Sequence, residues 1–417
     1  MVAQGFVLDT GYGRHLLRSA LVGVVSGLSV LLFLGAEHLL HEVVWSGRET
    51  PSGWFTGSMY AVVIVLLAGA AVGWLRSRFA MHGPDPNFID ELIEGEVEPG
   101  HAVRIASIGL TSLVGGASVG PEAPLGSLGA GIGTAVARRS GDLEEEKADL
   151  TFAGISAVFG GLGTFAYVGP IMAMEIYHPR WSSGFKRMAP GLVSALTAFL
   201  VLFPALGTPF LAVYQIPAPQ LKLWWIPAAL LLGLLGAVVG LGVAVAMGLS
   251  GRLAARVTHP VLRGLAGAAV IAAVGFALPL TMFSGRQELG VIISDGASLS
   301  LGLLAMVVLG KILAFVVSMR WGFFGGPFFP LLFIGAALGA LIAQVIPGLP
   351  LAVAVISLAA GACASLIPLP LMVIILTSMI FGLPVEMTVL PSVAAVTAYL
   401  AVHGTGVLTW LQGVKDR

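Results

Sequence analysis

The sequence that decides the fold runs from residue 120 to residue 133 and reads Gly120-Pro121-Glu122-Ala123-Pro124-Leu125-Gly126-Ser127-Leu128-Gly129-Ala130-Gly131-Ile132-Gly133. It returns 206 residues later as Gly326-Pro327-Phe328-Phe329-Pro330-Leu331-Leu332-Phe333-Ile334-Gly335-Ala336-Ala337-Leu338-Gly339, with seven of the fourteen positions identical. Proline in the first turn of a helix costs little, because its missing N–H would have no intrahelical partner there. Each copy therefore predicts the start of a helix. The repeat as a whole predicts two related halves of the chain, at about residues 16–216 and 223–412.

The composition places these helix starts in a membrane. Of the 417 residues, 57% are hydrophobic and 10% are charged, whereas a soluble domain has about 25% charged residues. The 21 basic and 21 acidic residues cancel, so the chain has no basic field that would attract nucleic acid. The single cysteine, Cys363, cannot form an internal disulfide or a cysteine-rich metal site. We expect a multi-pass protein of the inner (plasma) membrane, surrounded by lipid bilayer, with no cofactor and no metal.

Several apolar runs are too long and too interrupted for single spans. A span needs about 20 apolar residues, but the runs over residues 107–138 and 321–347 carry internal glycine and proline. Such runs are typical of broken or re-entrant helices, whose freed backbone groups must line a cavity or be buried in protein. We predict an all-α polytopic fold with broken and re-entrant helices. It forms a single transmembrane domain over residues 1–417, with no cytosolic regulatory domain.

Glu122 is the acidic residue for which the sequence most strongly indicates a function. A carboxylate between two prolines in an apolar zone would cost about 3 kcal/mol at the bilayer centre. Two helix N-termini that converge in a membrane form an anion site without any lysine or arginine. The carboxylate of Glu122 at such a start would compete with a permeating anion and could also carry a proton. The alternative is that Glu122 caps its own helix in a water-exposed loop.

Three other charged residues lie in or next to apolar sequence. Asp85, before Pro86, is explained by helix capping alone, although a place in an ion pathway is the rival interpretation. Lys311 and Arg320 bracket an apolar run, where they could snorkel to the interface or line a vestibule.

These motifs resemble those of the CLC family of chloride channels and proton/chloride exchangers. Gly120-Pro121-Glu122-Ala123-Pro124 is similar to the second signature motif of that family, and Gly326-Pro327-Phe328-Phe329-Pro330 matches every fixed position of the Gly-x-Phe-x-Pro motif. The resemblance extends from about Leu16 to Trp410 and points to a divergent bacterial ion-transport branch. It implies that Glu122 is the gate, that the backbone N–H of Phe328 faces the central anion, and that Gly120 and Gly326 shape the helix starts. It also implies a homodimer with one pore per subunit, each pore built from two inverted halves, and a fold of roughly 16–18 helices.

The sequence departs from the family pattern at several positions. Where the family's first motif offers a serine hydroxyl to the anion, the matching segment is Gly83-Pro84-Asp85-Pro86, so Gly83 and Asp85 are the anion-binding candidates there. Pro121 replaces a basic residue, and Pro327 replaces a residue that would donate a backbone N–H. The late tyrosine that closes the inner gate has no clear match, and Thr409 is the candidate for its place.

Proton coupling is tied to Glu175. Exchangers of the family carry an inner glutamate as the second of two adjacent acids, whereas Ala173-Met174-Glu175-Ile176 has one acid, at the first of these places. Glu175 is either an inner entry for protons or the partner of Arg180 or His178 at a helix end.

These observations favour transport of a small inorganic anion, with chloride as the default because of the resemblance, by a channel or a proton-coupled exchanger. A membrane enzyme would need a nucleophile with a base, or an acidic metal cluster, and the sequence offers neither. We therefore expect no enzymatic activity. The alternative is a cation- or proton-coupled secondary transporter of another solute, with Asp85 and Glu122 as cation ligands.

Overall fold

The computed structural model describes eight stretches of the chain, namely residues 10–46, 58–81, 96–140, 144–163, 166–177, 181–217, 219–296 and 299–406. Over these residues the protein is helical, with fifteen α-helices and no β-strand. Eight helical segments are long and apolar enough to cross a membrane: Gly11–Trp45, Met59–Arg78, Met188–Leu206, Trp225–Ala255, Pro260–Ala277, Leu301–Arg320, Phe328–Val345 and Val385–Gly404. The prediction of an all-α polytopic membrane protein is confirmed.

Two compact units make up the chain. The first comprises Met1–Gly35, Pro86–Ala106 and Leu125–Phe210, and the second comprises Ala36–Asp85, Ser107–Pro124 and Leu211–Arg417. Three helices contribute residues to both units: α1 (Thr10–Trp45), α4 (Pro99–Val114) and α5 (Glu122–Ser140).

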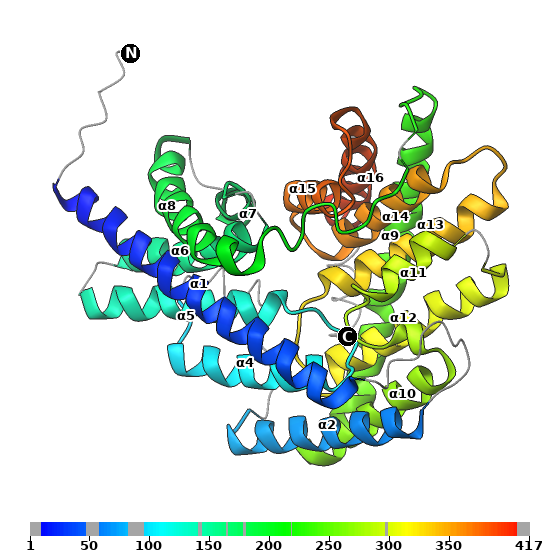
Figure 1. The fold of residues 1–417 in the computed structure, drawn as a ribbon, viewed down its shortest axis with the longest axis horizontal. Coiled ribbons are helices and arrows are strands. Elements are labelled where there is room, and N and C mark those ends of the chain that lie inside the picture. The colour runs from blue at the N-terminus through cyan, green and yellow to red at the C-terminus, as the bar shows by residue number, and fades with distance from the viewer. Residues whose placement is uncertain are drawn as a thin grey trace. The chain divides into compact units, whose positions relative to one another are not determined.

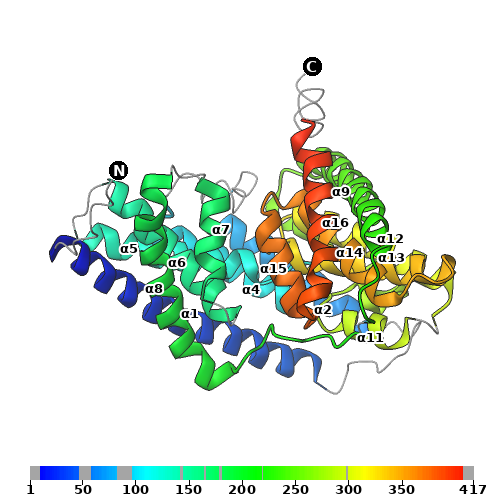
Figure 2. The same cartoon turned by 90° about the horizontal axis from the view of Figure 1, so that it is seen from above.

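The first unit contains α6 (Glu144–Leu162), α7 (Val168–Tyr177) and α8 (Trp181–Leu206), which pack against one another (Figure 2). Helices α5 and α6 cross closely within this unit. A methyl group added at Gly129 would collide with the backbone of Gly154, and one at Gly154 would collide with the backbone of Gly129. Close approach of this kind is the usual reason for small residues at helix crossings in membranes.

The second unit holds the remaining elements (Figure 1). They are α2 (Met59–Arg78), α9 (Trp225–Ala255), α10 (Pro260–Ala277), η1 (Pro279–Thr281), α11 (Glu288–Asp295), α12 (Leu301–Arg320), α13 (Phe328–Val345), α14 (Leu351–Leu366), α15 (Pro370–Ile380), η2 (Val385–Thr388), α16 (Val389–Tyr399) and the π-helical turn η3 (Leu400–Gly404).

Helix α14 is the core of the second unit. Every residue from Ala352 to Ser365 is buried, as expected for a helix that is apolar on all sides. Its neighbours are α9, α13 and α16. On α13, a methyl group at Gly335 would lie 2.7 Å from the Cα atom of Ala359, and one at Gly339 would lie 2.6 Å from the Cα atom of Val355. These two glycines are four residues apart, so they form one smooth face that lets α13 approach α14.

The offset of 206 residues recurs in the hydrogen bonds of the second unit. The Ser112 hydroxyl accepts a bond from the backbone N–H of Phe324 at 3.1 Å, and the Ser318 hydroxyl accepts one from the backbone N–H of Ser118 at 3.0 Å. Ser112 and Ser318 are 206 residues apart, and so are Ser118 and Phe324. Each serine also donates to the carbonyl four residues before it in its own helix. The stretches that immediately precede the two copies of the motif thus bond to each other reciprocally.

Candidate functional site

The site is built where the two copies of the repeated motif meet. The N–H of Gly120 donates to the carbonyl of Gly326 at 2.8 Å, and the N–H of Gly326 donates to the carbonyl of Gly120 at 2.7 Å. This isolated antiparallel bridge joins the two residues that the repeat aligns. Each glycine is followed by a proline, and helices α5 and α13 begin one residue later, at Glu122 and Phe328. The bridge therefore fixes two helix N-termini beside each other.

The Glu122 side chain lies against the N-terminus of α13. Its Oε1 atom accepts a hydrogen bond from the backbone N–H of Phe329 at 3.1 Å. Its Oε2 atom is buried and has no hydrogen-bond partner among the residues that the structure describes. A carboxylate with one buried oxygen unpartnered is costly, which is typical of a functional group rather than a structural one.

The two bridge glycines make the room for this carboxylate. A methyl group at Gly120 would lie 2.5 Å from the carboxyl carbon of Glu122, and one at Gly326 would lie 2.8 Å from the same atom. In both cases the Oε2 atom would be closer still. Any side chain at either position would therefore occupy the space that the carboxylate fills.

The arrangement is suited to holding an anion. The first N–H groups of a helix have no intrahelical partners, and the helix dipole adds about half a positive charge at this end. In α13 one of these N–H groups, that of Phe329, donates a hydrogen bond to the Glu122 carboxylate. The carboxylate thus takes a position in which the structure stabilises negative charge without a basic side chain.

Cys363 is a further neighbour of this helix start. It lies on α14, is fully buried, and donates its thiol to the carbonyl of Phe328 at 3.6 Å. The sequence offered no signal for this contact, because the acceptor is a backbone group and the apolar surroundings predict only a buried filler.

Lys311 supports the segment that leads to the site. Its side chain is fully buried, and its Nζ atom donates to the carbonyls of Thr281 at 3.2 Å, Met282 at 3.0 Å and Phe283 at 2.8 Å. The backbone N–H of Phe283 in turn donates to the carbonyl of Gly116, in the turn before the Gly120 motif, at 3.2 Å. Lys311 therefore does not snorkel to the interface, because its charge is satisfied by three backbone carbonyls inside the protein.

The structure brings together three of the residues predicted for the site, namely Gly120, Glu122 and Gly326. Phe328 begins α13 as expected, but the N–H that bonds the carboxylate belongs to Phe329, which the sequence analysis did not single out. A helix start can be placed from a Gly-Pro motif to within a residue, which is too coarse to say which N–H points at a ligand.

The other predicted residues lie elsewhere. Gly83, Asp85 and Thr409 fall outside the described residues. Glu175 is a partly buried residue of α7 in the first unit.

Residues 68–403 match the family described as voltage gated chloride channel. Among similar proteins, YfeO of Escherichia fergusonii is 26% identical over 356 residues, which cover 80% of this chain and 80% of the relative. YfeO of Salmonella newport strain SL254 is 26% identical over 352 residues, covering 81% and 82%. The names of both relatives describe an ion-transport protein.

The fold is similar to those of solved transporters. A slow cyanobacterial Cl⁻/H⁺ antiporter superposes with a TM-score of 0.78 at 20% identity, over 97% of this chain and 99% of the other. A CLC-type fluoride/proton antiporter superposes with a TM-score of 0.75 at 20% identity, over 94% and 95%. These likenesses establish that the chain has the fold of these transporters.

Proposed function

Because the chain belongs to the voltage-gated chloride channel family, we propose that it carries a small inorganic anion across the membrane through the site at Glu122. The observation that supports this most directly is the bond from the N–H of Phe329 to the Glu122 carboxylate. A carboxyl oxygen already occupies the helix start, so a permeating anion would find the same N–H donor after the side chain leaves. Chloride is the default substrate. Fluoride is the first alternative, because one of the similar structures is a fluoride/proton antiporter.

In this proposal Glu122 is the gate. The ionised carboxylate and the anion compete for one position, since two negative charges cannot share it at low cost. Proton binding removes the charge of the carboxylate and weakens its bond to Phe329. The neutral side chain then moves aside and leaves the site to the anion. One group thereby couples anion entry to a proton.

Further anion contacts belong to the proposal as well. Gly120 and Gly326 act by leaving space and by setting the helix starts, while Gly83, Asp85, Phe328 and Thr409 are the other candidates that the family resemblance supplies. We also propose a homodimer in the inner membrane, with one pore in each subunit formed by the halves at about residues 16–216 and 223–412. The paired hydrogen bonds at an offset of 206 residues support the equivalence of the two halves.

Glu175 is the proposed second proton site. It is partly buried on α7, as an acid that must exchange protons with water would be. We expect the change Glu175→Gln to abolish proton movement and to spare anion flux, measured together in liposomes. If proton movement survives in Glu175→Gln, the residue has a structural role at the end of α7.

The proposal is tested by an anion efflux assay. Liposomes that contain the purified protein are loaded with chloride, and chloride efflux and external pH are recorded together for the wild type and for Glu122→Gln. Efflux that makes the outside alkaline, with loss of the pH signal in the variant, supports an exchanger gated by Glu122. Efflux without a pH signal supports a channel-like protein.

The same assay can reject the proposal. If chloride does not move, it is repeated with fluoride and nitrate. Failure of all three anions contradicts the proposal. A flux that depends on sodium or on a neutral solute, and is indifferent to the anion, would favour the cation- or proton-coupled transporter of another solute.

A further inference from the structure

Four helix ends come together at one end of the second unit. The C-terminal part of α2 meets the start of α10, since a methyl group at Gly73 would lie 2.5 Å from the Pro260 carbonyl. The C-terminal part of α9 meets the end of α12, where the indole N–H of Trp321 donates to the Ser250 hydroxyl at 2.9 Å. Trp321 also packs on α10, because a methyl group at Gly267 would lie 2.5 Å from its Cβ atom. These contacts join α2, α9, α10 and α12 at one surface.

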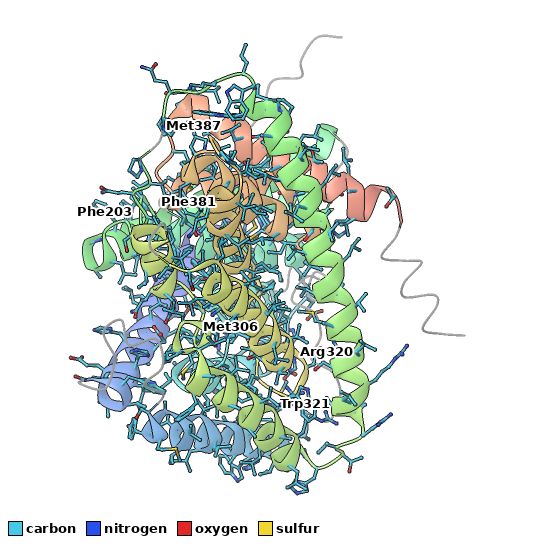
Figure 3. All side chains as sticks on the ribbon, turned by 90° about the vertical axis from the view of Figure 1, so that its right-hand side faces the viewer. Phe203, Met306, Arg320, Trp321, Phe381 and Met387 are labelled. Carbon is cyan, nitrogen blue, oxygen red and sulfur yellow. The ribbon has the colours of Figure 1, made fainter. Side chains whose placement is uncertain are left out.

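Four exposed arginines, which we call the arginine face, lie on these helix ends: Arg78 of α2, Arg252 and Arg256 at the end of α9, and Arg320 of α12. Figure 3 shows Arg320 and Trp321 beside α9, and the Arg320 guanidinium would lie 2.6 Å from a methyl group at Gly251. None of the four arginines makes an ion pair within the described part of the chain.

No acidic residue balances this charge along the segments that carry it. Residues 74–80, 246–263 and 317–322, all of which the structure describes, contain neither aspartate nor glutamate. In a protein whose total charge is zero, this is a local concentration of positive charge. Guanidinium groups bind phosphate oxygens through paired N–H donors, so such a cluster fits a phosphate better than a monatomic anion.

Large apolar side chains are exposed next to the arginine face. Trp74 of α2, Leu249 and Leu253 of α9, and Leu262 of α10 are each more than half exposed. Leu249 and Leu253 lie three and one residues from the arginines of α9 and belong to the same helix end. A surface with guanidinium groups at helix ends and exposed leucines beside them matches a lipid molecule, whose phosphate and acyl chains are likewise adjacent.

We infer that the arginine face binds the phosphate of an anionic glycerophospholipid, while the apolar residues beside it contact the acyl chains. A free phosphate ion could make the same guanidinium–phosphate contact as the lipid phosphate. The exposed leucines and Trp74 favour the lipid, because inorganic phosphate has no apolar part that could contact them. This lipid site uses none of the residues of the proposed anion pathway and does not depend on that proposal.

The inference is tested by lipid binding to the purified full-length protein. Native mass spectrometry in detergent would follow titration with phosphatidylglycerol, with phosphatidylcholine of the same chain length, and with inorganic phosphate. The variant is Arg252→Gln/Arg256→Gln. The matched control is Arg104→Gln/Arg139→Gln, which also removes two exposed arginines that make no ion pair within the described residues.

We expect the wild type to bind phosphatidylglycerol in preference to phosphatidylcholine. Each arginine near an anionic headgroup contributes about 1 kcal/mol, so the double change on α9 should weaken phosphatidylglycerol binding about 30-fold. The control should bind as the wild type does. A thermal unfolding curve for each variant checks that the protein is folded, and Arg252→Lys/Arg256→Lys, which keeps the charge, should recover part of the binding.

Three outcomes would overturn the inference. Equal binding of the two lipids would show that the phosphate charge is not recognised. Equal loss in the α9 variant and the control would show that overall charge rather than this face matters. Inorganic phosphate that displaces phosphatidylglycerol at matched concentration would assign the face to a soluble phosphate and not to a lipid.

Discussion

The change Gly326→Ala should dislodge the Glu122 carboxylate while leaving the fold intact. The new methyl group would lie 2.8 Å from the carboxyl carbon, whereas ordinary contact begins at 3.4 Å. The carboxyl carbon must therefore recede by at least about 0.6 Å, and the Oε2 atom, which lies closer to the methyl group, must recede further. Two of the three atoms in conflict, the Oε2 atom and the carboxyl carbon, are at the far end of a flexible side chain, and the third, the Glu122 Cβ atom at 3.0 Å, needs to move only a few tenths of an ångström. We therefore expect the side chain to yield before the backbone does.

The size of the effect follows from the bond that is lost. A recession of this size takes the contact with the N–H of Phe329, now 3.1 Å, past the range of a hydrogen bond. A hydrogen bond to a charged group contributes about 1.5–3 kcal/mol. The equilibrium between the seated and the displaced carboxylate should therefore shift about 10- to 150-fold toward the displaced state. Gly326→Ala should raise anion flux and weaken proton movement, and the weaker proton movement is also the result expected of Glu122→Gln.

The assay is anion efflux from liposomes with external pH recorded, accompanied by thermal unfolding in detergent. Gly302→Ala is the matched control, because nothing lies within 4 Å of a methyl group at that position. In a Glu122→Ala background, Gly326→Ala should change nothing further. The reasoning is refuted if folded Gly326→Ala transports and couples like the wild type, or if its effect persists without the Glu122 side chain.

Two further predictions concern stability, measured as the midpoint of thermal unfolding in detergent. Lys311→Met should cost about 3 kcal/mol, because three buried carbonyls lose their donor even though the burial of a charge is relieved. The control is Leu313→Met, a change at an exposed neighbouring residue, which should lower the free energy of unfolding only slightly. An unchanged midpoint for Lys311→Met would contradict the role of the Lys311 ammonium group. Ser112→Ala and Ser318→Ala should each lower the free energy of unfolding by about 1–3 kcal/mol, and by similar amounts. Each change leaves one buried backbone N–H without its acceptor. A neutral result for either serine would show that its bond does not hold the two repeated segments together.

Much of the fold follows from two properties of the sequence. Low charge and long apolar runs require a membrane protein, and glycine and proline inside those runs require broken helices. The alignment at an offset of 206 residues equated Gly120 with Gly326, and the structure joins these two residues by reciprocal hydrogen bonds. Extending the same alignment would have paired Ser112 with Ser318 and Gly116 with Gly322. The last pair adopts positive φ angles of 82° and 107°, which favour glycine.

The site was less accessible from sequence because its contacts are made by the backbone. The donor to Glu122 is a main-chain N–H of Phe329, and the acceptors of Lys311 are three main-chain carbonyls. Backbone groups are present at every position, so no residue pattern marks the ones that are used. Residue spacing could place a carboxylate at a helix start, but it could not say that Lys311 is buried rather than snorkelling.

Anion binding to the purified protein tests the central claim most directly. Isothermal titration with chloride, or with the anion that the flux assay identifies, would compare the wild type with Glu122→Ala. If the carboxylate occupies the position of the anion, its removal should strengthen binding tenfold or more, because the anion no longer displaces a charge-assisted hydrogen bond. Equal or weaker binding in Glu122→Ala would contradict the claim that Glu122 and the anion share one site.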